Sequence, residues 1–187
     1  MKNDYTGIEK NYEELINIAK AYMRELNDPE HDINHMNDVV LYTKELLDVV
    51  ADNIDVEACI IAAYWHDVGR IKLDQGHEKL SADMLKEVME SKGFDHDFIN
   101  KCYQAILNHR FDMNPTTIEG HLIKDADKLA FIGLGRWQNC VEKHYPLNSI
   151  LALLPSLKEE VFYFKESKKI YDRDVIKLIN FLHNRVM

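Results

Sequence analysis

The segment from Val56 to His66 is apolar almost all round, and no other feature limits the fold as strongly. From Ala58 to Trp65 it reads Ala-Cys-Ile-Ile-Ala-Ala-Tyr-Trp. A helix with this composition offers no polar face to water, so it must be buried on every side. The sequence therefore predicts a compact helical bundle that encloses this helix.

Apolar residues recur with a period of about 3.6 along most of the chain, which predicts an all-α protein. Seven glycines and four prolines are few for 187 residues. Only Val161–Phe164 has the composition of a strand, and its surroundings favour a helix. Asp32 is suited to cap the second helix. The predicted helices cover about residues 8–26, 33–51, 56–66, 77–91, 95–109, 116–132, 149–166 and 171–186.

Length and charge narrow the class of protein. A chain of 187 residues with 46% hydrophobic and 29% charged side chains fits one globular domain with a real core. The net charge of −9 argues against non-specific nucleic-acid binding, because an acidic surface repels a phosphate backbone. It does not exclude a small phosphorylated substrate, because a bound metal can reverse the local field. A homo-oligomer is also compatible with this composition.

The compartment follows from cysteine usage and from the absence of targeting segments. Cys59, Cys102 and Cys140 are odd in number and far apart, which favours reduced, buried thiols. The first ten residues are polar and do not resemble a signal peptide. No apolar run approaches the length of a membrane span. We therefore expect a cytoplasmic protein without a membrane partner.

Several acidic and histidine residues fall beside predicted core positions. His66-Asp67 ends the most apolar helix, where an ionised carboxylate is costly unless it is paired or bound to metal. Asp67 could instead cap a turn before Gly69. Asp127 lies beside the apolar stripe of its helix, with Asp125 nearby. The two carboxylates suggest a cation, although either could face solvent.

His35 and His109 lie at the buried edges of two other predicted helices. A single histidine on an apolar face is more often a hydrogen-bonded core residue than a ligand. The interpretation changes when three helices each direct a histidine or an aspartate inward, because helix bundles build metal sites from side chains on facing helices.

These residues also carry a resemblance. His35, His66-Asp67 within Ala-Ala-Tyr-Trp-His-Asp-Val-Gly-Arg, and Asp127 within Lys-Asp-Ala-Asp-Lys-Leu resemble the motif set of the HD superfamily of metal-dependent phosphohydrolases. The opening Asp28 to His35 is similar to that of small stand-alone bacterial HD hydrolases. The resemblance implies a single HD domain over residues 1–187, with a motif core at about 28–135 and a helical C-terminal extension at 136–187.

The resemblance also implies which residues bind a metal. One divalent ion would be held by His35, His66, Asp67 and Asp127, and Asp125 is the weaker candidate because the family residue directly precedes the Lys-Leu pair. Branches of the family add two histidines that match His77 and His109. In those branches the two histidines bind a second metal or the substrate phosphate.

Two positions depart from the family pattern. Arg70 stands where Lys is usual, which keeps the positive charge and favours bidentate phosphate contact. Ala130 stands where many relatives have a second acidic residue. These departures affect the expected class of substrate more than the expected metal binding.

The resemblance and the ligand set that it implies together predict the chemistry. Mixed nitrogen and oxygen ligands suit Mn, Fe, Co, Ni or Zn better than Mg alone. A divalent ion makes hydroxide available near neutral pH, and that hydroxide would attack the phosphorus of a nucleotide or another small phosphate ester. Asp67 would orient the water. The side chains expected to neutralise the other phosphate oxygens are Arg70, His77, His109 and Lys128.

Three alternatives remain open at this stage. A regulatory module could keep the ligands and bind a metal or a nucleotide without turnover. A di-iron oxygenase is a second alternative, because a minority of HD proteins carry out that chemistry. The third is an all-α protein without a site.

Overall fold

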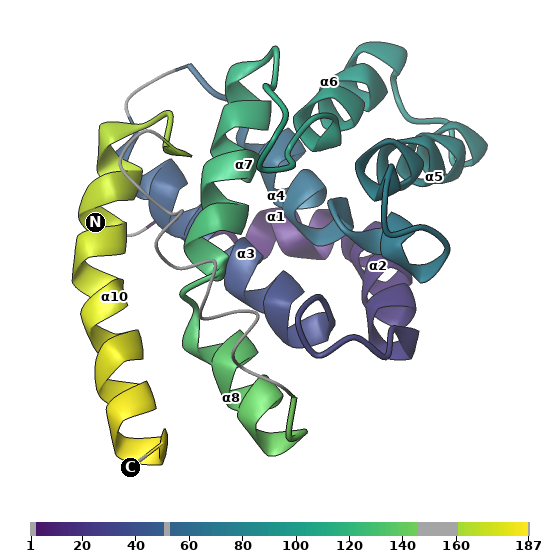
Figure 1. Cartoon of the computed structure of the whole chain (residues 1–187). Helices are drawn as coiled ribbons and strands as arrows, with labels where there is room; N and C mark the ends of the chain where they lie inside the picture. Colours follow the sequence, from purple (N-terminus) through teal and green to yellow (C-terminus); the bar gives the residue numbers. More distant parts are fainter. Residues whose placement is uncertain (1–2, 51–52, 146–160, 187) are drawn as a thin grey trace.

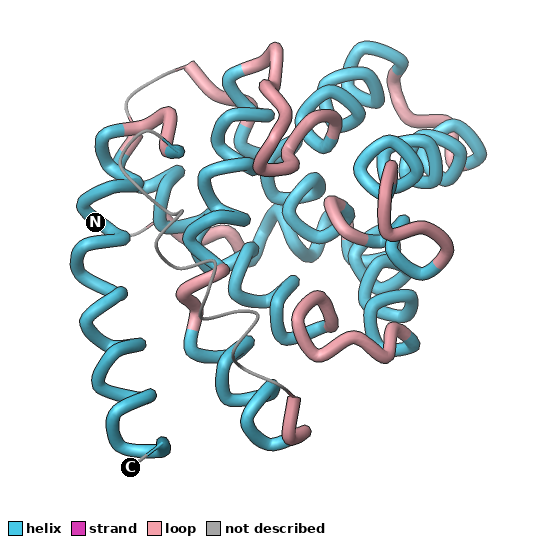
Figure 2. Tube along the Cα trace, in the orientation of Figure 1, coloured by secondary structure: helices cyan, strands magenta, loops and turns pink. Residues whose placement is uncertain are grey.

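The computed structural model describes residues 3–50, 53–145 and 161–186. Within these ranges the chain forms nine α-helices and one short 3-10 helix, η1 (Val68–Ile71), and no strand (Figure 2). The prediction of an all-α protein is therefore confirmed. The helices are α1 (Thr6–Asn11), α2 (Glu13–Glu25), α3 (Ile33–Val49), α4 (Val56–Trp65), α5 (His77–Ser91), α6 (His96–Ile106), α7 (Ile118–Ala130), α8 (Leu134–Glu142) and α10 (Lys165–Val186).

Helix α4 lies inside the bundle, as its composition predicts. It contacts α2, α3, α6 and α7, and Figure 1 shows it enclosed by neighbouring helices. Every residue from Ala58 to Trp65 is buried. The helix begins at Asp55, whose carboxylate accepts a hydrogen bond from the amide of Ala58 at 3.1 Å. Burial of α4 on all sides fixes its C-terminal end, which carries His66-Asp67, deep in the molecule.

Helices α3 and α7 pack against each other beside α4, and both begin at side-chain caps. Asp32 accepts from the amide of Asn34 at 2.8 Å, so its predicted capping role is confirmed. Thr117 accepts from the amide of Gly120 at 3.1 Å. These caps fix where each helix starts, and thereby which residues face α4.

The predicted helices differ from the observed ones in two respects: one predicted helix is divided, and two elements were not predicted. The first helix is divided at Tyr12 into α1 and α2, and the Tyr12 hydroxyl donates to Glu57 at 2.5 Å. Helix α8 and η1 were not anticipated, because glycines at 133 and 135 weaken the helical pattern and η1 is only four residues long. At Tyr12 a tertiary contact outweighs the periodicity, and η1 is too short for the periodicity to reveal it.

The predicted helix at 149–166 falls mostly outside the described residues. Within the described part, residues 161–164 are neither α-helix nor strand, and α10 begins only at Lys165. The reason is a tertiary cap: Asp125 of α7 accepts hydrogen bonds from the amides of Tyr163 and Phe164 just before the helix. The predicted final helix therefore begins earlier than expected.

A second, smaller core lies between α8 and α10, which run side by side in Figure 1. Its buried members are Phe131, Ile132, Trp137, Cys140 and Leu178. All three cysteines are buried and free, as the sequence predicts. Among the described helices, none combines the length and the apolarity that crossing a bilayer requires.

Candidate metal centre

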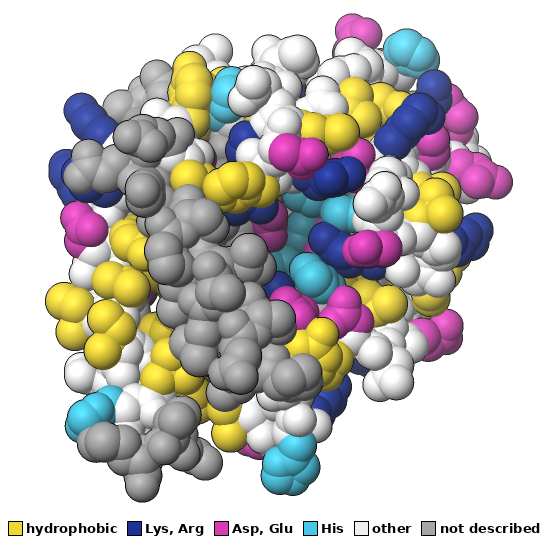
Figure 3. All heavy atoms as spheres, viewed as in Figure 1, with side chains coloured by type: hydrophobic (Ala, Val, Ile, Leu, Met, Phe, Trp, Pro, Cys, Tyr) yellow, Lys and Arg dark blue, Asp and Glu magenta, His cyan; other side chains and the backbone are white. Residues whose placement is uncertain are grey.

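Six histidine and aspartate side chains from five parts of the chain meet in the interior. Figure 3 shows a hollow in this face of the molecule with histidines in its walls and Lys, Arg, Asp and Glu side chains around it. Five of the six side chains are at most 2% exposed, and that of Asp127 is 14% exposed. They are His35 on α3, His66 and Asp67 at the end of α4, His77 at the start of α5, His109 after α6, and Asp127 on α7.

His35, His66 and Asp127 form one group that could hold a metal ion, with all ligand atoms within 4.8 Å of one another. The Nε2 of His35 lies 3.2 Å from Oδ1 of Asp127 and 3.3 Å from Nε2 of His66. Oδ2 of Asp67 is 3.6 Å from both of these Nε2 atoms. Four donor atoms thus converge from three helices and from the turn after α4.

The other oxygen of Asp67 faces a different pair of histidines. Its Oδ1 lies 3.0 Å from Nε2 of His77 and 3.5 Å from Nε2 of His109. His66, Asp67 and His109 make up a second group with the spacing of metal ligands. Asp67 is therefore common to both sides of the centre, which is the arrangement needed for a carboxylate that bridges two cations.

Three of the histidines are oriented by the main chain. In each, Nδ1 lies within hydrogen-bond distance of the carbonyl oxygen three residues earlier, and a carbonyl can only accept, so Nδ1 must carry the proton. The pairs are His66 with Ala63 at 2.9 Å, His77 with Asp74 at 2.6 Å, and His109 with Ile106 at 2.8 Å. Each ring then presents a bare Nε2 lone pair to the centre.

With Nδ1 protonated, the Nε2 of His77 is a hydrogen-bond acceptor, and it faces a second acceptor, the carboxylate of Asp67. The Nε2 of His77 and Oδ1 of Asp67 lie 3.0 Å apart, yet both are buried without a hydrogen-bond partner among the described residues. Two lone pairs at this distance repel each other unless a proton or a cation lies between them. Metal-ligating histidines commonly donate the other ring N–H to a backbone carbonyl, as these rings do. The donor set therefore fits a divalent cation.

Electrostatics favour the same protonation states. Burial lowers the pKa of His35 to about 3 in spite of the opposing hydrogen bond with Asp127. Burial also lowers the pKa of His66. Burial alone would raise the pKa of Asp67, but His66 and Arg70 outweigh it, so that pKa lies well below the usual range. The charge of Lys128 likewise outweighs burial at Asp127, so the pKa of Asp127 also lies well below the usual range. Near neutral pH the carboxylates are charged, and His35 and His66 are neutral.

The pKa of His77 is shifted in the opposite direction from those of His35 and His66. Burial lowers its pKa, but the nearby carboxylate of Asp67 favours the protonated ring and outweighs burial, so the net shift is upward. Without a cation, a proton between the two groups relieves the contact between their lone pairs. A cation that binds there must displace this proton.

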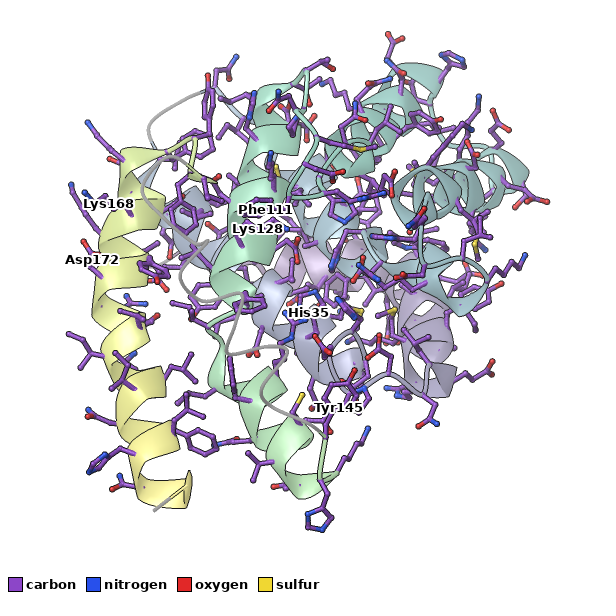
Figure 4. The ribbon with its side chains drawn as sticks, viewed as in Figure 1. His35, Phe111, Lys128, Tyr145, Lys168 and Asp172 are labelled. Carbon is purple, nitrogen blue, oxygen red and sulfur yellow. The ribbon has the colours of Figure 1, made fainter. Side chains whose placement is uncertain are left out.

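Two basic side chains contact the aspartates. The Nε of Arg70 lies 2.9 Å from Oδ2 of Asp67, and its NH1 lies 2.8 Å from Asp74. Lys128 lies 2.6 Å from Oδ2 of Asp127, and Figure 4 labels it together with His35. Both cations offset the concentrated negative charge. Their predicted contact with a substrate phosphate stays a prediction.

Gly69 lies where η1 packs closely against the start of α5. Its amide donates to Oγ of Ser81 at 2.8 Å, and a Cβ at this position would lie 2.4 Å from the carbonyl oxygen of His77. Any side chain here would push η1 away from α5. Glycine is therefore required for Asp67 and His77 to approach each other.

Asp125 has a structural role that the sequence left open. Its carboxylate accepts from the amides of Tyr163 and Phe164 at 3.0 and 2.9 Å, and from the hydroxyl of Ser167 at 2.6 Å. It thus points to the start of α10, and of the two carboxylates only Asp127 lies in a group that could hold a metal ion. Histidines elsewhere in the chain belong to neither metal-ligand group: His31, His96, His121, His144 and His183.

Three further residues border the centre. Glu78 is buried, with Oε2 at 3.8 Å from Nδ1 of His77. Arg136 is buried, lies 3.4 Å from Nε2 of His31, and its charge helps to lower the pKa of His35. The His31 ring packs edge-on against that of His35, with the ring centroids 5.6 Å apart. No local pattern marks Glu78 or Arg136, because their place depends on tertiary packing.

Comparison with known proteins adds two findings. A crystal structure described as a predicted HD superfamily hydrolase, from an uncultured Thermotogales bacterium, has the same fold, with a TM-score of 0.71. The two sequences are 24% identical, and the match covers 97% of each chain. No curated protein matches the sequence. The model of the HD domain family matches residues 32–132, more than half of the chain, and this span holds all six side chains of the centre. The chain therefore belongs to the HD domain family.

Proposed function

We propose that the protein is a divalent-metal-dependent phosphohydrolase that acts on a nucleotide or another small phosphate ester. The observation that carries the proposal is the carboxylate of Asp67, buried between bare imidazole nitrogens on both of its oxygens. Membership of the HD domain family supports it. The description of the Thermotogales protein as a predicted hydrolase is further support.

In this proposal His35, His66, Asp67 and Asp127 hold the first cation. His77 and His109 hold a second one across Asp67, or else contact the substrate. Imidazole-rich sites favour Mn, Fe, Co, Ni or Zn over Mg. A divalent cation supplies Lewis acidity there, which makes hydroxide available near neutral pH and polarises a phosphoryl oxygen.

The chain's own groups supply the remaining functions. Asp67 aligns the attacking water by accepting a hydrogen bond from it, because its oxygens face both groups of imidazoles. Arg70 and Lys128 keep the aspartates ionised and attract an anionic substrate to the hollow. If His77 and His109 are not ligands, each ring donates Nε2–H to a phosphate oxygen only in its protonated form, because Nδ1–H is already donated to a carbonyl.

A carboxylate that lies close to imidazoles through both of its oxygens also fits a di-iron oxygenase, and this is the second candidate. Oxygen consumption that depends on bound iron separates the two functions. Binding of a nucleotide without turnover would instead indicate a regulatory module.

The test is a substrate screen with metal-stripped protein to which Mn, Co, Ni, Mg and Zn are each restored. We expect chelation to remove phosphatase or phosphodiesterase activity and one of the transition metals to restore it. His66→Ala should remain inactive with every metal, whereas His96→Ala should behave as the wild type, since His96 lies in neither ligand group. Activity that survives exhaustive chelation would contradict the mechanism.

A further inference from the structure

Phe111 is a large apolar side chain that is 49% exposed. It lies in residues 107–117, which connect α6 to α7 and include His109 two positions earlier. A single exposed phenylalanine is ordinary on a protein surface. The surroundings of this one are not ordinary, because its segment is fixed along α7 and its ring lies beside the metal centre.

Three residues on one face of α7, spaced four apart, hold the segment in place. At Gly120 a Cβ would lie 2.8 Å from the Cβ of Pro115, so only glycine allows this approach. The Nζ of Lys124 donates to the carbonyl oxygen of Met113. Lys124 is largely buried, and burial lowers its pKa. The segment is therefore supported by a rigid helix rather than free to move away from it.

Lys128, the third of these residues, connects the ring with the centre. Its Nζ lies 5.9 Å from the centroid of the Phe111 ring and 2.6 Å from Oδ2 of Asp127. Figure 4 labels Phe111 and Lys128 together at α7, near His35. One ammonium group thus lies between an exposed aromatic face and a carboxylate of the metal centre. A molecule whose phosphate reaches the centre would have its organic part close to Phe111.

The residue next to Phe111 adds positive charge on the same segment. Arg110 has its NH1 at 4.0 Å from Oε1 of the buried Glu78, which follows His77. The exposed ring is therefore accompanied by two cations, Arg110 and Lys128, each of which also contacts a carboxylate: Arg110 that of Asp112 at 3.1 Å and Lys128 that of Asp127. This pairing of a flat apolar surface with cations matches a molecule that has a planar aromatic group and a phosphate.

We propose that Phe111 is a specificity-determining residue, on which a planar aromatic group of the substrate stacks while its phosphate lies at the metal centre. The inference rests on the proposed hydrolase function and narrows its substrates to phosphate esters of nucleoside type over those of plain sugars. Lys128 contacts both the Phe111 ring and Asp127, so the surface that would bind the aromatic group lies next to the metal centre.

The test compares adenosine 5′-monophosphate with ribose 5-phosphate, which carry the same phosphate on the same kind of alcohol and differ in the base. We expect the wild type to prefer the nucleotide. Phe111→Ala should lower the ratio of the two kcat/KM values by about tenfold, the effect of losing one stacked base. Phe111→Trp should keep the preference. Tyr163→Ala is the matched control, because Tyr163 is an exposed aromatic residue that stacks on His121.

Titration calorimetry of both compounds with metal-loaded protein gives the same comparison without turnover. Loss of the preference in Phe111→Ala and its retention in Phe111→Trp support the inference. An unchanged preference in Phe111→Ala, or a wild type that does not distinguish the two compounds, overturns it. A protein that hydrolyses no phosphate ester with any metal contradicts the hydrolase proposal instead, and the ratio of dissociation constants still decides the role of Phe111.

Discussion

The two sides of the centre share Asp67 but are built differently. On one side, His35 and Asp127 lie within long packed helices, and His66 caps α4; we call these three the helix side. On the other, His77 begins α5 and His109 follows the end of α6; we call these two the turn side. The pKa of His35 and His66 is lowered on the helix side, whereas that of His77 is raised on the turn side. The helix side is therefore prepared for a cation, and the turn side competes with a proton.

The strongest test of this comparison removes the residue that both sides share. Asp67→Ala should abolish binding of every divalent ion, because it removes one charged ligand atom from each side. Inductively coupled plasma mass spectrometry of the purified protein measures this directly. Stoichiometric metal in Asp67→Ala would show that the two sides work independently of it.

Changes confined to the turn side should have a smaller effect. His77→Ala or His109→Ala should lower hydrolysis at least tenfold, which corresponds to about 1.4 kcal/mol of transition-state stabilisation, while the first metal stays bound. If these histidines are ligands, the wild type binds two ions and each variant one. If they bind phosphate, metal content does not change and KM rises. A double variant with wild-type turnover would make them ordinary core residues.

Opposite pKa shifts predict opposite effects on the pH dependence of stability in metal-stripped protein. His35, with a pKa of about 3 against an ordinary 6.5, takes up its proton only on unfolding, so it makes stability fall as pH drops from 6.5. His77 contributes stability below 6.5 that is lost as pH rises through its raised pKa. The free energy of urea unfolding, measured from about pH 4 to about pH 9, should therefore change differently in His35→Gln and in His77→Gln.

His35→Gln should flatten the acidic arm of that profile, by at most about 1.4 kcal/mol per pH unit, and His77→Gln should flatten the arm above 6.5. Chelator must be present throughout, because a bound metal suppresses both titrations. If both variants change the same arm, the difference between the two sides is not electrostatic.

The smallest effect on the centre is expected from Asp125→Ala. This change leaves two amides and a hydroxyl near α10 without their acceptor, so the free energy of unfolding should fall by about 1–3 kcal/mol. Metal content should stay at the wild-type value, whereas Asp127→Ala, two residues away on the same helix, should lose metal. Chemical denaturation and metal analysis of this pair separate support of the fold from support of the site.

The sequence predicts most of the helix side, because each of its residues interrupts a regular apolar pattern. Burial of α4 and the inward direction of His35 follow from periodicity. The assignment of His77 depends on resemblance alone, since it opens a helix and no stripe contains it. Glu78 and Arg136 could not be found at all, because their contacts join segments far apart in the chain.

The same limit applies to the C-terminal part of the fold. The start of α10 is decided by the carboxylate of Asp125, about 40 residues away, and local propensity contains no information about that contact. Periodicity alone also places Asp125 and Asp127 beside one stripe, and only the resemblance favoured Asp127 as the ligand. Only the neighbours of α7 distinguish a helix cap from a potential ligand.

The carbonyl three residues before each of His66, His77 and His109 has a consequence for folding. Each ring is oriented by the short segment that carries it, so its rotamer can be selected before distant helices meet. Assembly of the bundle then has to bring together segments that are already organised, and little side-chain entropy remains to be lost when an ion arrives. We therefore expect the rate of metal uptake to be governed by how readily the ion sheds its water, with little delay from rearrangement of the protein.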